Sequence, residues 1–166
     1  FDTARTRTAY ERIISDFEKG KTQILIGTQM LSKGLDFGNV SVVGILSADS
    51  LMNFPDFRAH ERAYQLMVQV SGRAGRRDKR GTVILQTTQP EHPLIRMVQH
   101  FAYKEMVSLQ LSERSMFRYP PYYRLIVLIL RSRNEEALQE MSALYAEKLR
   151  ARLGERVLGP VTPPIT

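Results

Sequence analysis

Cysteine is absent from this 166-residue chain, so its own residues can form neither a disulfide nor a thiolate metal site. The three histidines, at positions 60, 92 and 100, do not show the spacing of metal ligands. No apolar run approaches the ~20 residues that a membrane-spanning helix needs. These absences exclude a disulfide-rich protein, a cysteine zinc module and a membrane-spanning protein.

Basic residues outnumber acidic ones, and the 24 Lys and Arg against 17 Asp and Glu give a net charge of +7. A basic surface favours a polyanionic partner, most simply nucleic acid. The proportions of hydrophobic residues (43%) and charged residues (25%) are typical of a soluble folded protein. Because the chain begins at Phe1 rather than Met and stops just after an apparent strand start, we expect a fragment of a longer protein.

Alternating helix and strand patterns predict an α/β fold with a mostly parallel sheet. The stretch TAYERIISDFEKGK predicts an amphipathic helix closed by Gly20, and a second helix is expected over roughly residues 57–70. Three short apolar runs predict buried strands: QILIGT (23–28), VSVVGILSAD (40–49) and GTVILQTT (81–88). Ligands bind at the carboxyl ends of strands in such sheets, which is where GTQMLSKGLDF (27–37) falls.

A domain boundary is predicted at FRYPPYYR, because two consecutive prolines cannot continue the helical pattern of residues 91–116. The domains are then residues 1–118 and 119–166. In the second domain YRLIVLILRS predicts a strand, residues 134–154 a helix with Asn134 as its N-cap, and RVLGPV a further strand. This order is the β-α-β start of a truncated small α/β unit.

The stretch QVSGRAGRR (69–77) concentrates arginine and glycine directly after the second predicted helix. Glycines at 72 and 75 permit close backbone approach and unusual dihedral angles, so that Arg73 and Arg76 can be aimed across a cleft. Guanidinium groups are planar, always charged and able to bind two phosphate oxygens at once. One interpretation is therefore a phosphate clamp, and the other is a solvated basic turn.

Two motifs carry a resemblance to a known family. QVSGRAGR resembles motif VI of superfamily 2 helicases, Q-x-x-G-R-x-G-R, and GTQMLSKGLDF resembles motif V, one strand and one helix earlier. Residues 24–76, RSMFRYPPYYR (114–124) and VLGPV (157–161) resemble the PriA family of primosomal replication-restart helicases, also known as primosomal protein N′. The resemblance implies the distal part of the second RecA-like helicase lobe, followed by the start of the C-terminal domain.

The family resemblance implies an ATP-dependent 3′ to 5′ DNA helicase that recognises stalled or branched replication forks and restarts replication through primosome assembly. By motif VI, Arg76 is the arginine finger on the γ-phosphate and Arg73 is a second phosphate or interlobe contact. Gln69 and Gly72 belong to the same nucleotide site. In this interpretation Arg73 and Arg76 reach a nucleotide held by the first lobe only when the two lobes close.

Motif V implies contacts with DNA. Gly27 and Thr28 would meet a DNA phosphate, Lys33 would shape the DNA-binding loop, and Asp36 would face the nucleotide ribose or couple it to the DNA. Each residue also has a simpler interpretation, because Thr28 could cap the next turn, Asp36 could form an Asx-turn and Lys33 could be a solvated loop charge.

Departures from a complete helicase are also informative. The chain has no G-x-x-x-x-G-K-[ST] phosphate loop and no Walker B acid with its helicase-type neighbours, so we expect the fragment alone to be inactive. ATP and Mg²⁺ are implied for the full-length protein, as is zinc, for which this fragment has no ligands. The implied partners are single-stranded and forked DNA, other primosome proteins and single-strand DNA-binding protein, in the bacterial cytoplasm and not at a membrane.

Two rival functions stay open: another superfamily 2 translocase of the RecG type, and a non-catalytic nucleic-acid or partner-binding module with a helicase-lobe fold. The tyrosines at 119, 122 and 123 could stack on bases or pack the joint between the domains. His60 and Glu61 are expected at a helix surface or an interlobe contact. Five methionines are expected to fill the core: Met30, Met52, Met67, Met97 and Met106.

Overall fold

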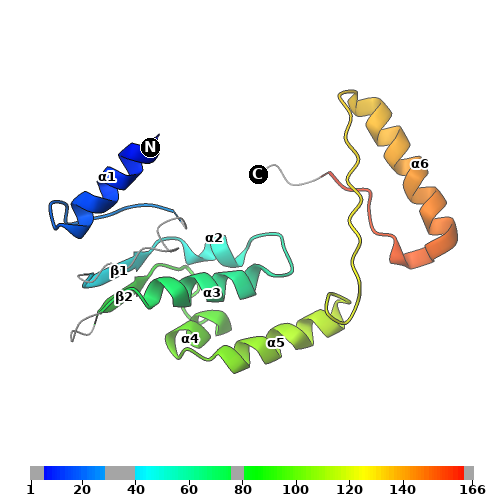
Figure 1. Cartoon of the computed structure of the whole chain (residues 1–166). Coiled ribbons are helices and arrows are strands. Elements are labelled where there is room, and N and C mark those ends of the chain that lie inside the picture. Colours follow the sequence, from blue (N-terminus) through cyan, green and yellow to red (C-terminus); the bar gives the residue numbers. More distant parts are fainter. Residues whose placement is uncertain (1–5, 29–39, 76–80, 163–166) are drawn as a thin grey trace. The chain divides into compact units, whose positions relative to one another are not determined.

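The computed structural model describes residues 6–28, 40–75 and 81–162 (Figure 1). It divides into two compact units, Phe1–Arg124 and Leu125–Thr166. The predicted α/β class is confirmed, because helices accompany a sheet whose two strands are parallel. The predicted boundary after residue 118 stays a prediction. In the described part of the chain, no helix combines the length and apolar character needed to cross a bilayer.

The first unit contains one sheet and five α-helices in its described residues. In chain order the elements are α1 (Arg7–Glu18), β1 (Val42–Ile45), α2 (Ala48–Met52), α3 (Ala59–Ser71), β2 (Thr82–Leu85), α4 (Pro93–Gln99) and α5 (Tyr103–Met116). The strands pair in parallel, with Val42 opposite Thr82 and Ile45 opposite Leu85. A parallel pair needs a crossover connection, which α2 and α3 provide. The predicted helices at residues 8–21, 57–70 and 91–116 are confirmed.

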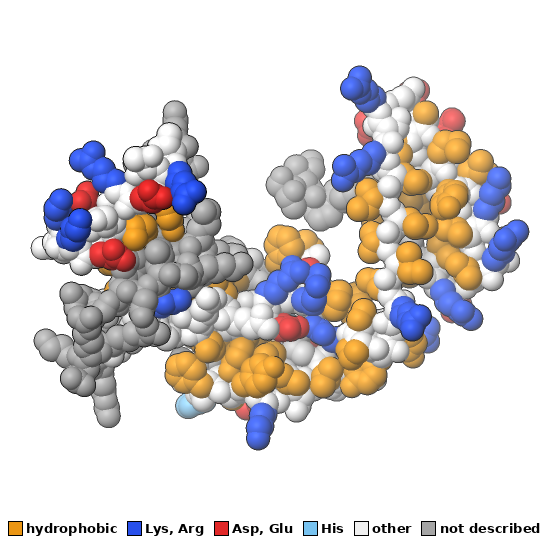
Figure 2. Space-filling model, viewed as in Figure 1, with side chains coloured by type: hydrophobic (Ala, Val, Ile, Leu, Met, Phe, Trp, Pro, Cys, Tyr) orange, Lys and Arg blue, Asp and Glu red, His pale blue; other side chains and the backbone are white. Residues whose placement is uncertain are grey.

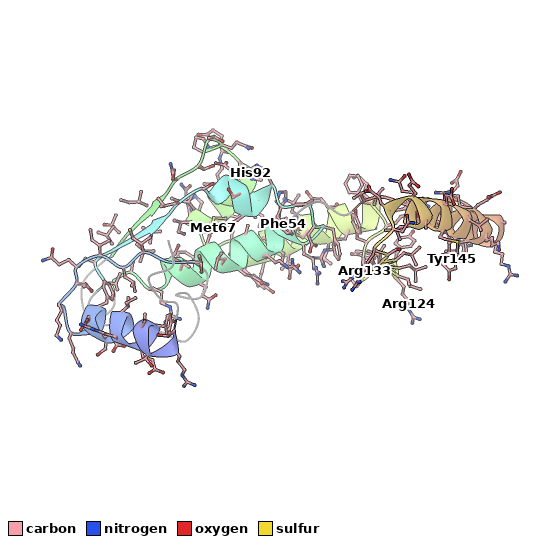
Figure 3. All side chains as sticks on the ribbon, turned by 90° about the horizontal axis from the view of Figure 1, so that it is seen from above. Phe54, Met67, His92, Arg124, Arg133 and Tyr145 are labelled. Carbon is pink, nitrogen blue, oxygen red and sulfur yellow. The ribbon has the colours of Figure 1, made fainter. Side chains whose placement is uncertain are left out.

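The core of this unit is centred on α3, which packs against β1, α2, α4 and α5. The buried core consists of Ile45, Ala48, Met52, Ala63, Tyr64, Met67, Leu94, Ile95, Met97, Val98 and Met106. Met67, labelled in Figure 3, has no exposed surface. The predicted core methionines are therefore confirmed at four positions, and Met30 lies outside the described residues. Flexible thioether side chains suit the uneven space between helices of different direction.

Residues 23–28 do not form the buried strand that their apolar run predicts. They are irregular in the structure, and the side chains of Ile24 and Ile26 are 78% and 85% exposed. A strand needs a hydrogen-bonded neighbour, and no described residue pairs with this segment as a strand. The second and third predicted strands are confirmed in shorter form as β1 and β2, although Ile45 is the only buried residue of β1.

Helix α4 begins with a histidine cap (Figure 3). The Nδ1 atom of His92 accepts a hydrogen bond from the Leu94 N–H at 3.1 Å, and Pro93 occupies the first helical position. Nδ1 can accept this bond only when the imidazole is neutral. Burial lowers the pKa of His92 below its ordinary value, and the neighbouring His60 lowers it further, while Asp49 and Glu113 act in the opposite direction.

We expect the stability of the chain to fall under mildly acidic conditions because of this cap. The contribution of neutral His92 is fully present above the ordinary histidine pKa of about 6.5 and is lost as the pH falls through the lower pKa of the folded state. The loss should approach about 1 kcal/mol, the usual contribution of an N-cap. Urea unfolding of wild type and His92→Asn across pH 5 to 8 measures it, because asparagine caps a helix without titrating.

Below neutral pH, the unfolding free energy of the wild type should fall as the pH falls, and this slope should be reduced in His92→Asn. The control His100→Asn, which changes an exposed histidine at the other end of α4, should retain the slope. An equally steep slope in His92→Asn would show that the cap does not titrate in this range.

The second unit contains α6 (Glu135–Leu153) and the short 3-10 helix η2 (Gly154–Arg156). The predicted N-cap is confirmed, because Asn134 Oδ1 accepts from the Ala137 N–H at 3.0 Å. Glutamates occupy the first turn and arginines the last turn, which complements the helix dipole. Gly154 ends the helix with a φ of +61°, a conformation that favours glycine.

An extended segment precedes α6 and another follows it, in the order of the predicted β-α-β unit. The two segments do not pair as strands in the described residues. The apolar run 125–130 is consequently exposed, by between 45% at Leu130 and 83% at Ile126. Figure 2 shows apolar side chains gathered on the surface of this unit.

Candidate functional site

The end of α3 carries three of the residues predicted to meet nucleotide, Gln69, Gly72 and Arg73. The Gly72 N–H donates to the Val68 carbonyl at 3.0 Å, and the Arg73 N–H donates to the Val70 carbonyl at 3.0 Å. The side chain of Gln69 is exposed and that of Arg73 is half-buried. Gln69 therefore lies in the last turn of α3, and Gly72 and Arg73 form the hydrogen-bonded turn that directly follows it.

The two predicted glycines of this motif behave differently. Gly72 is the C-cap of α3 with a φ of −65°, so it does not use the unusual dihedral angles that glycine permits. Gly75 has a φ of +83°, in the left-handed region that favours glycine, as predicted. A Cβ on Gly81 would lie 2.3 Å from the Gly75 backbone nitrogen, so glycine is required at position 81 for this close approach.

One hydrogen bond joins the flanks of the two predicted motifs. The Gly75 N–H donates to the Val40 carbonyl at 3.1 Å. Val40 directly follows residues 29–39 of the motif V region, and Gly75 directly precedes residues 76–80 of the arginine-rich stretch. Beside this bond, the Thr82 N–H donates to the Ser41 carbonyl at 2.9 Å. Gly75 of the predicted motif VI is therefore bonded to the residue two positions before β1.

The positions of the other predicted site residues differ. Lys33, Asp36 and Arg76 lie outside the described residues. Gly27 and Thr28 are described and exposed, and they directly precede residues 29–39. Because residues 23–28 form no strand, the expectation that this region follows the carboxyl end of a strand is not met.

The carboxyl ends of β1 and β2 hold a polar cluster that sequence reasoning missed. Asp49 accepts hydrogen bonds from the Thr88 N–H at 2.9 Å and the Thr87 hydroxyl at 2.8 Å. These two bonds, the first more strongly, lower the pKa of the Asp49 carboxyl below its ordinary value. Gln86 accepts from the N–H of Ser47, whose φ is +55°. The cluster uses its polar groups internally to join the segments that follow β1 and β2. The available signal was the polar residues in the last positions of both predicted strand runs.

The aromatic and histidine residues singled out in the sequence have separate surroundings. Tyr119 stacks on Phe57 with ring centroids 4.7 Å apart and planes 9° from parallel, which supports the packing interpretation for this tyrosine. Tyr122 and Tyr123 are 53% and 50% exposed. His60 contacts His92 edge to face at 5.4 Å, in agreement with a helix contact.

The residues described here do not suit the metals that the resemblance implies. No group of three or more histidine, aspartate or glutamate side chains in residues 6–28, 40–75 and 81–162 is arranged to hold a metal ion. The chain also has no cysteine, the usual ligand of structural zinc. No chemical step is therefore assigned to a metal bound by these residues.

Comparison with known proteins identifies two family regions. A model described as the helicase conserved C-terminal domain matches residues 1–78, and one described as the primosomal protein N C-terminal domain matches residues 115–166. The first region includes both motif segments and supports the predicted RecA-like lobe. The second region includes α6.

Relatives named replication restart protein PriA align with nearly the whole chain. The Bacillus subtilis protein is 44% identical over 99% of the chain, and the Synechocystis protein is 41% identical over 99%. The Haemophilus influenzae protein is 36% identical over 99%. The chain spans between 20% and 23% of the length of these relatives. It therefore belongs to the PriA family, with one region that matches the helicase conserved C-terminal domain and a second that matches the primosomal protein N C-terminal domain.

Proposed function

We propose that this region works within an ATP-dependent DNA helicase that moves 3′ to 5′ and restarts replication at stalled or branched forks through primosome assembly. The observation that carries the proposal is the 3.1 Å hydrogen bond from Gly75 to Val40. It links Gly75, inside the segment that resembles a nucleotide-contacting motif, to Val40, three residues after the segment that resembles a DNA-contacting motif. Through this bond, a displacement of one segment is transmitted to the other. A motor that couples nucleotide state to DNA movement requires such a connection.

In the proposed mechanism the arginines after α3 act on nucleotide. Arg76 reaches the γ-phosphate and stabilises the charge that develops on it, and Arg73 makes a second phosphate or interlobe contact. Gln69 and Gly72 contribute to the same nucleotide site. The regular end of α3 supports this arrangement, since it gives Gln69 and Arg73 a rigid base.

The motif V residues act on DNA in this proposal. Gly27 and Thr28 hold a DNA phosphate through backbone and hydroxyl donors, and Lys33 lies in the same loop beside the DNA. Asp36 faces the nucleotide ribose or couples it to the DNA site. Closure of the two lobes around ATP would then move the DNA-holding loop together with the arginines.

Other parts of the full-length protein complete the proposed machine. The phosphate loop and the Mg²⁺ site belong to the first lobe, so the region described here is inactive alone, and zinc is held elsewhere. The DNA partners are single strands and forks. The protein partners are other primosome proteins and single-strand DNA-binding protein, in the bacterial cytoplasm.

Strand polarity tests the proposed function. In a full-length protein containing this region, we expect single-stranded DNA to stimulate ATP hydrolysis. We expect ATP-dependent unwinding of a duplex with a 3′ single-stranded tail and none of the matched duplex with a 5′ tail. The measurements are steady-state phosphate release and strand displacement, with a non-hydrolysable ATP analogue as the control. ATPase stimulated by branched duplex but not by single strands would instead favour a RecG-like translocase, and DNA binding without turnover would favour a binding module.

A further inference from the structure

Arg114, in the last turn of α5, is a largely buried cation with a side chain only 15% exposed. Its guanidinium forms an ion pair with Glu61 in the first turn of α3, 53 residues away in the chain. The guanidinium carbon also lies 5.2 Å from the centroid of the Phe57 ring, just before α3. One side chain of α5 therefore contacts both the start of α3 and the loop that leads into it.

The segment that follows α5 joins the same cluster. The Tyr119 N–H donates to the Arg114 carbonyl at 2.8 Å, and the Tyr119 ring stacks on Phe57. Arg114 Nη1 donates to the Pro120 carbonyl at 3.5 Å, a long and weak bond. The chain that leaves α5 thus folds back onto the entrance of α3. We use the name α3 entrance cluster for Phe57, Glu61, Arg114 and Tyr119.

The α3 entrance cluster is not tightly packed on every side. It borders a hollow of about 260 Å³, which Phe57, Arg114 and Tyr119 help to line. The Nε atom of Arg114 is buried and has no hydrogen-bond partner among the described residues. A buried donor without a partner costs free energy that a shifted arrangement of the same side chains could recover. The cluster therefore has both the space and an energetic reason to adopt a second arrangement.

We propose that Glu61 and Arg114 are positioning residues, which transmit movement of the segment after α5 to the proposed nucleotide site. Helix α3 is a continuous helix of 13 residues, so a tilt imposed at Glu61 reaches Gln69 and, just beyond the last turn, Arg73. The separation along the helix axis from Glu61 to Gln69 is roughly 12 Å. Movement of the C-terminal region thereby sets how well the arginines reach nucleotide. This inference rests on the proposed function.

A double-mutant cycle in the full-length protein tests the pair: Glu61→Gln, Arg114→Gln and both together. The readout is the ratio of ATP turnover with saturating single-stranded DNA to turnover without DNA. Glu61→Gln leaves the largely buried Arg114 without its partner, and Arg114→Gln does the same to the partly buried Glu61, so we expect the ratio to fall by about fivefold or more in each. The double variant should lose less than the product of the two single losses, because both charges are removed.

Melting temperature separates positioning from simple packing. A packing role alone lowers the melting temperature but leaves the ratio unchanged at temperatures well below it. Tyr119→Leu and Tyr119→Phe give a second comparison, since phenylalanine keeps the ring that stacks on Phe57 and leucine does not. We expect Tyr119→Leu to lower the ratio and Tyr119→Phe to retain it. The matched control is Tyr145→Leu, which changes a tyrosine of α6 that is 47% exposed.

An unchanged ratio in folded Arg114→Gln and Tyr119→Leu proteins would overturn the inference, and so would fully additive losses in the cycle. If the glutamine variants do not fold, the comparison of Tyr119→Leu with Tyr119→Phe tests the inference instead. A wild-type protein without DNA-stimulated turnover would overturn the proposed function itself. Normal stimulation in the wild type with no effect of the variants would overturn only the role of the α3 entrance cluster.

Discussion

Replacement of Arg76 by alanine in the full-length protein is expected to lower single-strand-stimulated ATP turnover roughly a thousandfold, the usual effect of removing an arginine finger. DNA affinity should be retained, because the proposed DNA contacts lie in the motif V segment. The physical reason is that negative charge develops on the transferred phosphoryl group in the transition state, and a positioned guanidinium stabilises it. Steady-state ATPase assays and fluorescence anisotropy with labelled single-stranded DNA measure the two quantities in parallel.

The control for this prediction is Arg96→Ala, which removes a surface arginine of α4. Arg96 pairs with Glu91, and the two side chains are 61% and 81% exposed. Such a pair contributes little to stability, so turnover should stay within about twofold of the wild type. Unchanged turnover in Arg76→Ala would contradict the finger assignment. A loss of DNA affinity in proportion to turnover would place Arg76 on DNA instead.

Replacement of Met67 by alanine is expected to lower the free energy of unfolding by roughly 2 to 5 kcal/mol. Met67 has no exposed surface, and it lies on the helix that contacts β1, α2, α4 and α5. Truncation leaves a cavity that close-packed neighbours fill only in part. Its backbone carbonyl also accepts the Ser71 hydroxyl at 2.6 Å, so relaxation around the cavity would reach the end of α3. Urea unfolding followed by circular dichroism gives the change in midpoint.

Met116→Ala is the matched control, because Met116 is 73% exposed at the end of α5. Its cost should be within about 0.5 kcal/mol. The slope of unfolding free energy against urea should be unchanged in both variants, which would show that only stability differs. Equal costs for the two methionines would contradict the central position of α3 in the core.

Most helices were predictable from local pattern, whereas the short helix α2 was not predicted and begins inside the predicted strand 40–49. A helix satisfies its own backbone hydrogen bonds, so apolar spacing and end signals are sufficient to locate it. Asn134 at the start of α6 and Gly154 at its end are such signals, and both act as predicted. The buried methionines of α3, α4 and α5 follow from the same periodicity.

The strands were predictable only in part. An apolar run such as residues 23–28 is compatible with a buried strand, but the partner that would complete its hydrogen bonds is not specified locally. The run 40–49 forms β1 because Thr82–Leu85 pairs with it in parallel. The arginine motif shows a similar limit. Its residue types indicate phosphate chemistry, but they do not show that Gly72 caps α3 with an ordinary φ of −65°.

The sequence by itself determined the α/β class, the helices other than α2, the excess of positive charge and the motifs that resemble those of the PriA family. Only the tertiary structure decided that Gly75 bonds to Val40 and that Arg114 pairs with Glu61. These contacts join residues 35 and 53 positions apart, which lie together only because the elements around α3 pack into one core. Local pattern carries information about a residue and its near neighbours, whereas the contacts that relate the two motifs depend on how whole helices pack.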